Sequence, residues 1–157
     1  MSHPRGVDCS SRLLYLALNA VPDRSTDMPL LKFTLREGRT PQQIRQLLDS
    51  AHAAVVQAFG IPERDRYQVV DERESGQVIA LDTGLGIDRS ENLVIIEIVS
   101  RRRTVSQKQR LYELLAEHLH RDCGLDPDDL IVSIVENEDA DWSFGRGRAQ
   151  FLTGELA

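Results

Sequence analysis

The chain has 157 residues, which fits one domain able to bury about two-thirds of its surface on folding. Its net charge of -6 and pI near 5.2 argue against a nucleic-acid binder, because phosphate contacts need clustered lysine and arginine. No apolar run approaches the ~20 residues of a membrane span. Two cysteines, Cys9 and Cys123, are too few for a disulfide framework and indicate a reducing, cytoplasmic location.

The first 27 residues differ in kind from the rest of the chain. An apolar run over 13–21 follows Arg5 and Arg12, as in a signal peptide, but Asp8 precedes it and no clear small-residue cleavage site follows. We therefore expect residues 1–28 to be an extension outside the folded domain, either upstream translation or a disordered tail. The folded domain is then expected to cover 29–157.

A first unit of the folded domain reads as strand, helix and strand. The alternating stretch 30–36 predicts a strand, and Thr40 with Gln43 forms a capping box at the start of a helix. Pro41 occupies the first helical position, where a missing N–H costs nothing. Apolar residues then recur at helical spacing up to Gly60, a typical helix-ending glycine, and a second strand follows at 67–72.

The same pattern recurs 64 positions later. Thr40, Gln43, Leu47, Gly60, Asp65 and Glu72 correspond to Thr104, Gln107, Leu111, Gly124, Asp129 and Glu136. Strands are predicted at 93–100 and 130–138, with a helix between them. The repeats, at about 29–72 and 93–138, are joined by the linker 73–92.

Two such repeats predict an α/β (α+β) fold. Each β-α-β unit has a right-handed crossover, so the pair gives a four-stranded mixed sheet with both helices on one face. The other face and the edges stay open, and we therefore expect a homo-oligomer. Residues 139–157 lie outside the repeat and are expected to form a pocket segment.

Three consecutive arginines, Arg101, Arg102 and Arg103, precede the second helix. The repeat does not require them, and the helix dipole disfavours cations there. Arginine side chains beside helix N–H groups are suited to an anion such as a carboxylate. In an extended segment the side chains of Arg101 and Arg103 point the same way. The alternative interpretation is a solvated basic loop whose arginines pair with acidic residues.

Pro29 raises a second chemical possibility. Its repeat counterpart is Leu93, so the fold does not demand proline there. After initiation at Met28 and removal of that residue, Pro29 would be a secondary amine with a pKa of about 8. Such an amine can take a proton, donate one or attack a carbonyl; an internal Pro29 amide cannot.

The segments MPLLKF, EGRT, FGIPERDRYQVV, DTGLG, SRRRT and VENEDADWSFGRGRAQFLTGEL resemble the malonate semialdehyde decarboxylases of the tautomerase superfamily. The resemblance implies a tautomerase-like homotrimer with a catalytic amino-terminal proline, Pro29, and no metal or organic cofactor. It further implies that Arg101 and Arg103 bind the substrate carboxylate, that Asp65 is the acidic partner, and that the aromatic residues Trp142, Phe144 and Phe151 form an apolar wall. The family pattern has a proline where this chain has Arg102.

Three functions remain open from the sequence. The first is cofactor-independent decarboxylation of malonate semialdehyde or a similar short 3-oxo acid. The second is a tautomerase or hydratase acting on 2-oxo acids with the same residues. The third is a non-catalytic trimer, which would follow if residues 1–27 keep the Pro29 nitrogen blocked in a peptide bond. Asp65 could also be architectural, because its counterpart Asp129 is an acid in the same turn.

Overall fold

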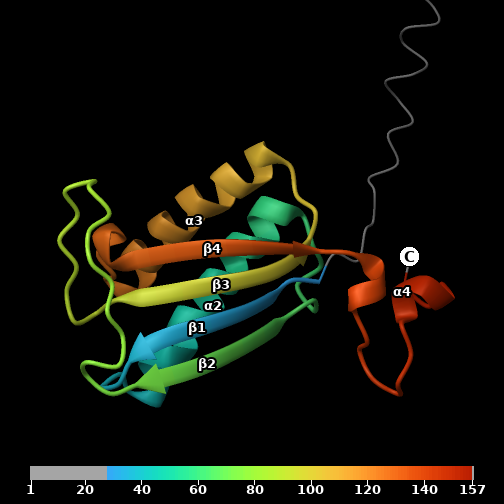
Figure 1. The fold of residues 1–157 in the computed structure, drawn as a ribbon, viewed down its shortest axis with the longest axis horizontal. Helices are drawn as coiled ribbons and strands as arrows, with labels where there is room; N and C mark the ends of the chain where they lie inside the picture. Colours follow the sequence, from blue (N-terminus) through green and yellow to red (C-terminus); the bar gives the residue numbers. More distant parts are fainter. Residues whose placement is uncertain (1–27, 157) are drawn as a thin grey trace, which may run out of the picture.

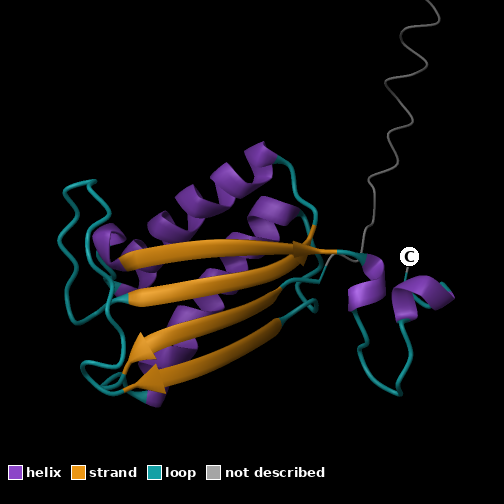
Figure 2. Cartoon of the chain, in the orientation of Figure 1, coloured by secondary structure: helices purple, strands orange, loops and turns teal. Residues whose placement is uncertain are grey.

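The computed structural model describes residues 28–156, so the expected extension lies, up to residue 27, outside the described residues. One four-stranded sheet, in the order β2-β1-β3-β4, carries the two long helices on one face (Figure 1, Figure 2). The strands are β1 (Leu30–Arg36), β2 (Tyr67–Arg73), β3 (Val94–Arg101) and β4 (Leu130–Asn137). The helices are α2 (Pro41–Phe59), α3 (Val105–Cys123) and the short α4 (Gln150–Thr153). The predicted fold class is therefore confirmed.

Strand directions decide which residues meet at each end of the sheet. β1 is parallel to β2 and antiparallel to β3, and β3 is parallel to β4. Leu30 pairs with Tyr67 on one side and with Val99 on the other. The beginnings of β1 and β2 therefore lie at the same end of the sheet as the last residues of β3 and β4, so Pro29 and Arg101 are at the same end.

Both helices begin and end as the repeat predicts. Thr40 and Thr104 each form a complete capping box with the glutamine three residues later. Gly60 and Gly124 follow the helices at φ values of 68° and 65°, in the left-handed region that favours glycine. Equal start and stop signals explain why α2 and α3 both have 19 residues.

The core lies between the sheet and the two helices. Its fully buried side chains include Phe33, Leu35, Ile96, Ile98, Val55, Leu111, Leu115 and Leu119. On the strands they alternate with more exposed residues, as expected for a sheet covered on one side. Tyr67, Val69 and Val135 are between 42% and 52% exposed. Within residues 28–156, no helix is long and apolar enough to cross a membrane.

Asp122 connects α3 to α2 and gives a testable pH dependence. Its carboxylate accepts hydrogen bonds from Arg121 at 2.7 Å and from the Ser50 hydroxyl at 2.9 Å. These bonds, first that from Arg121 and then that from Ser50, lower the pKa of Asp122 from 3.8 to about 2. Because the folded pKa is depressed, the stabilisation is complete above about pH 4 and is lost as the pH falls toward 2.

We expect Asp122→Asn to lower the melting temperature at neutral pH and to flatten its decline between about pH 4 and 2. Melting followed by circular dichroism over that range measures the effect. Asp88→Asn is the control, because Asp88 is exposed and no hydrogen bond to its side chain is found among the described residues. An unchanged acid dependence in Asp122→Asn would contradict the expectation.

Candidate active site

A cavity of about 510 Å³ lies at the end of the sheet where β1 begins. It is lined by Met28, Arg64, Asp65, Tyr67, Phe144, Gln150, Glu155 and Leu156. Pro29 follows Met28 directly, is buried, and immediately precedes β1. The cavity thus brings together the beginning of β1, the turn before β2 and the segment after β4.

Asp65 lies in the turn between α2 and β2 and is only 5% exposed. Its N–H donates to the Pro62 carbonyl at 3.0 Å, and its Oδ1 is 3.8 Å from Nε of Arg64. Its buried Oδ2 has no hydrogen-bond partner among the described residues. A buried carboxylate oxygen without a donor is costly, so this oxygen is suited to accept a hydrogen bond from a group that enters the cavity.

The counterpart Asp129 behaves differently. It is equally buried, but its two carboxylate oxygens accept from the backbone N–H and the hydroxyl of Ser90, both at 2.5 Å. The carboxylate of Asp129 is therefore bonded within the fold, whereas Oδ2 of Asp65 has no such bond among the described residues.

Arg101, the last residue of β3, contacts the segment after β4. Its Nε is 2.6 Å from Oδ1 of Asp139, and its guanidinium carbon is 5.0 Å from the centre of the Phe151 ring. These contacts bring Arg101 to the aromatic residues of the site.

Arg103 lies in a different environment. It is 6% exposed, and its guanidinium carbon lies 4.2 Å from the centre of the Phe59 ring. Its Nε donates to the Ser100 hydroxyl at 3.1 Å. Neither Arg103 nor Arg101 is among the residues that line the 510 Å³ cavity. The side chain of Arg102 is 90% exposed, in accord with the alternation expected for an extended segment.

Glu136 compensates the arginines, and sequence reasoning missed it. Its carboxylate accepts from the Arg103 N–H at 3.1 Å and from Lys108 at 2.6 Å, and lies 3.9 Å from Arg102. The hydrogen bond from Lys108, followed by that from Arg103, lowers the pKa of Glu136. An anion at this helix N-terminus offsets the unfavourable placement of three cations. Its identity with Glu72 in the repeat was the available signal.

The three predicted aromatic residues form one cluster, which Tyr67 joins. Trp142 stacks on Phe144 with centroids 5.3 Å apart, and Phe151 meets Phe144 edge-on at 5.4 Å. Tyr67, which sequence reasoning did not select, is 5.9 Å from Phe144. Its place two residues after Asp65, at the start of β2, was a signal from which it could have been predicted. Of this cluster, Tyr67 and Phe144 line the cavity together with Asp65, whereas Trp142 and Phe151 pack behind Phe144 and are not among its lining residues.

Gln150 fixes the turn that carries Phe144 of this cluster. Its Oε1 accepts from the Phe144 N–H at 2.9 Å, and its Nε2 donates to the Gly145 carbonyl at 2.8 Å. Asn137 accepts from the indole N–H of Trp142 at 2.9 Å. The amides of Gln150 and Asn137 therefore orient the two stacked rings.

Gln150→Ala is expected to loosen the aromatic cluster. The loss of two hydrogen bonds should lower the free energy of unfolding by about 1 kcal/mol and move the emission of Trp142, the only tryptophan, to longer wavelength. Urea unfolding and fluorescence measure both effects. Gln150→Glu, which keeps the acceptor for Phe144, should show the smaller change; equal effects in both variants would contradict this assignment.

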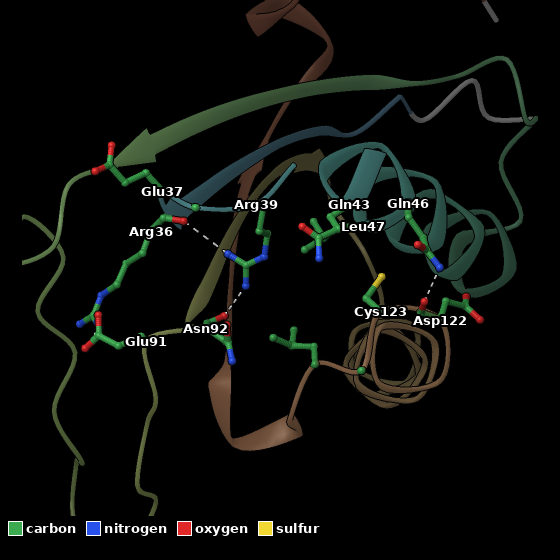
Figure 3. A pocket seen from close by; sticks show the side chains of 13 residues that line it. Arg36, Glu37, Arg39, Gln43, Gln46, Leu47, Glu91, Asn92, Asp122 and Cys123 are labelled. Carbon is green, nitrogen blue, oxygen red and sulfur yellow. Dashed lines mark hydrogen bonds and ion pairs between the residues drawn. The ribbon is translucent and has the colours of Figure 1, made fainter. Parts of the chain in front are cut away.

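The opposite end of the sheet holds a second cavity, of about 410 Å³ (Figure 3). Here Arg39, the counterpart of Arg103, donates to the carbonyls of Asn92 at 2.6 Å and Arg36 at 3.5 Å. Burial lowers the pKa of Arg39 and raises that of the nearby Cys123 thiol. Arg39 and Arg103, at equivalent positions of the two repeats, thus have different contacts. Among residues 28–156, no group of three or more potential metal ligands is found.

Comparison with known proteins identifies the family. A family profile described as Tautomerase enzyme matches residues 65–145, and another with the same description matches residues 29–87. The chain belongs to the tautomerase family. It is 54% identical to the probable tautomerase YrdN of Bacillus subtilis (strain 168) over 129 residues, which are 82% of this chain and 100% of the relative. It is 31% identical to the probable tautomerase YusQ of the same organism, over 80% of this chain and 99% of that one.

Solved structures extend this tautomerase assignment. Malonate semialdehyde decarboxylase, described with a structural basis for decarboxylase and hydratase activities, is 56% identical, with a TM-score of 0.80 over 82% of this chain and 99% of that one. FG41 malonate semialdehyde decarboxylase, inhibited by 3-bromopropiolate, is 40% identical, with a TM-score of 0.78 over 82% and 98%. The resemblance seen in the sequence is confirmed. The chain is a tautomerase-superfamily enzyme close to malonate semialdehyde decarboxylase.

Proposed function

We propose that the chain is a cofactor-independent decarboxylase of malonate semialdehyde or a similar short 3-oxo acid, with Pro29 as its amino-terminal catalytic residue. The observation that carries the proposal is the unpartnered oxygen of Asp65, buried at a cavity that is also lined by Met28, the residue before Pro29. One family profile also begins its match at Pro29. The active enzyme would then consist of residues 29–157, with 1–28 absent and 139–157 as the pocket segment.

Decarboxylation of a 3-oxo acid breaks the bond to the carboxylate and leaves an enolate. The site must therefore stabilise negative charge that develops on the carbonyl oxygen. A protonated Pro29 amine can donate a hydrogen bond to that oxygen, or the neutral amine can form an iminium that accepts the electron pair. Asp65 would favour the cationic form of the amine, because a nearby carboxylate raises the pKa of an amine.

Arginine and aromatic side chains complete the proposed chemistry. Arg101 and Arg103 would bind the substrate carboxylate, since guanidinium groups present paired N–H donors to it. The wall of Trp142, Phe144 and Phe151 would exclude water around the carboxylate and favour its conversion to neutral CO2. The chain supplies all of these groups from its own residues.

The test is product formation from malonate semialdehyde by a chain that begins at Pro29. Such a chain is made by initiation at Met28 and removal of that methionine, and intact mass confirms the start. We expect release of acetaldehyde and CO2 in equal amounts. No release of either product from the chain that starts at Pro29 would overturn the proposal.

A tautomerase or hydratase acting on 2-oxo acids is the second candidate. The name of YrdN, a probable tautomerase 54% identical to this chain, favours it. It would use the same Pro29, arginines and Asp65. Proton rearrangement or hydration of a 2-oxo acid, without CO2 release from malonate semialdehyde, would distinguish it from the decarboxylase.

The proposed assembly is a homotrimer. The sheet face opposite the helices, with Tyr67, Val69 and Val135 partly exposed, offers apolar surface for it. A fused 4-OT described as a symmetric trimer has the same fold, at 24% identity and a TM-score of 0.65. Light scattering on the chain that begins at Pro29 tests the assembly. If Pro29 is kept in a peptide bond, the trimer would be non-catalytic.

A further inference from the structure

Arg101 is held at one edge by a carboxylate of its own chain. Oδ1 of Asp139 is 2.6 Å from Nε of Arg101, and the Phe151 ring lies on the guanidinium at 5.0 Å. A guanidinium is planar, so one short bond at Nε together with a ring on its face fixes the plane in which its two terminal nitrogens lie. The two terminal nitrogens form one of the guanidinium edges that can bind a carboxylate with two parallel hydrogen bonds.

We propose that Asp139 is a positioning residue that orients Arg101 toward the substrate carboxylate, an inference that rests on the proposed function. Asp139 does not touch the substrate; it acts through Arg101. Bound at Nε, it directs the anion to the opposite edge of the guanidinium. Pre-orientation of this kind lowers the entropic cost of binding, because the arginine side chain is already held in place.

The place of Asp139 is itself well defined. It begins a short helical turn, Asp139–Asp141, which is separated from the end of β4 by Glu138 alone. Two hydrogen bonds close that turn. The Asp141 N–H donates to the Glu138 carbonyl at 3.0 Å, and the Glu138 N–H donates to the Asp141 carboxylate at 2.8 Å. Asp139 therefore lies on a closed turn rather than on a free end, as a group that orients another must.

The charge of Asp139 and its orienting effect on Arg101 have opposite consequences for anion binding. Variants of Asp139 separate the two effects. Asp139 also reduces the positive charge at Arg101, so its removal would strengthen anion binding if charge dominated. The two side chains are 42% and 28% exposed, and solvent screens such a pair strongly. Orientation should therefore dominate, and Asn at this position should preserve it, since its amide oxygen still accepts from Nε.

The experiment compares Asp139→Ala and Asp139→Asn with the unchanged chain, all beginning at Pro29. We expect Asp139→Ala to raise KM for malonate semialdehyde about 3- to 10-fold with kcat changed less than 2-fold, and Asp139→Asn to stay within about 2-fold in both. Calorimetric affinity for malonate, an unreactive dicarboxylate, should follow the same order. Asp49→Ala is the matched control, because Asp49 pairs with Arg66 at the same 2.6 Å but does not contact Arg101.

Other outcomes are equally decisive. An unchanged KM and malonate affinity in Asp139→Ala would overturn the role of Asp139. Tighter binding in both Asp139 variants would also overturn it, since Asp139 would then compete with the substrate for Arg101. Absence of decarboxylation by the unchanged chain would overturn the proposed function instead, and the malonate affinities would still decide the role of Asp139.

Discussion

Pro29→Ala, in a chain that begins at residue 29, is expected to lower kcat for decarboxylation about 10²- to 10⁴-fold, the range for loss of a positioned acid, base or nucleophile. Alanine keeps a primary amine at the same place, so some activity should remain. The full chain of 157 residues, in which the Pro29 nitrogen is an amide without a basic lone pair, should be less active still. Steady-state kinetics on the three chains measures this order.

The order of activity among the three chains tests whether a free amine at position 29 is needed. Because residues from Leu30 onward form β1 in either case, circular dichroism should give the same fold for the variant that begins at residue 29 as for its parent. Equal activity of the full chain and the chain that begins at Pro29 would contradict a role for a free amine. It would leave Asp65 and Arg101 as the groups to examine next.

Arg101→Ala and Arg103→Ala should differ in stability more than in activity. Both are expected to lower kcat/KM about 10²-fold or more, because each proposed carboxylate contact is charge-assisted. Arg103 is buried on Phe59 and bonded to Ser100, so its loss should also lower the free energy of unfolding by about 2–3 kcal/mol. Arg101→Ala should leave stability within about 1 kcal/mol, since the Asp139 pair is partly exposed.

Arg102→Ala is the matched control for both. Its side chain is 90% exposed, and a surface substitution of this kind changes stability by about 0.5 kcal/mol or less. Urea unfolding and kcat/KM for all three variants provide the comparison. If Arg103→Ala lost activity but kept the parent's free energy of unfolding, the stacking of Arg103 on Phe59 would not contribute to stability.

The fold could be predicted from the sequence because local signals agree with one another. Thr40 and Thr104 mark helix starts, Gly60 and Gly124 mark helix ends, and alternation marks the strands between them. Strand boundaries differ by about one residue: β3 is Val94–Arg101 rather than 93–100, and β4 ends at Asn137 rather than 138. An interior repeat doubles each signal, which makes the assignment firm.

The site could be predicted only in part, because its contacts join segments far apart in the chain. Periodicity does not indicate that Glu136 accepts from Arg103, or that Asp139 holds Arg101. The expectation of two convergent arginines came from strand alternation alone. Strand alternation cannot predict a contact with another element, and so it did not predict that Arg103 stacks on the Phe59 ring of α2.

The position of α4 has a practical consequence for handling the protein. Figure 1 shows α4 at the same end of the sheet as the start of β1, and Leu156 and Met28 line the same cavity. A purification tag or surface anchor joined directly to Met28 or Leu156 would therefore lie beside the pocket. The long connection between β2 and β3, at the other end of the molecule in Figure 1, exposes Leu81 and Leu85. A fluorophore or linker attached there would leave the pocket open to substrate.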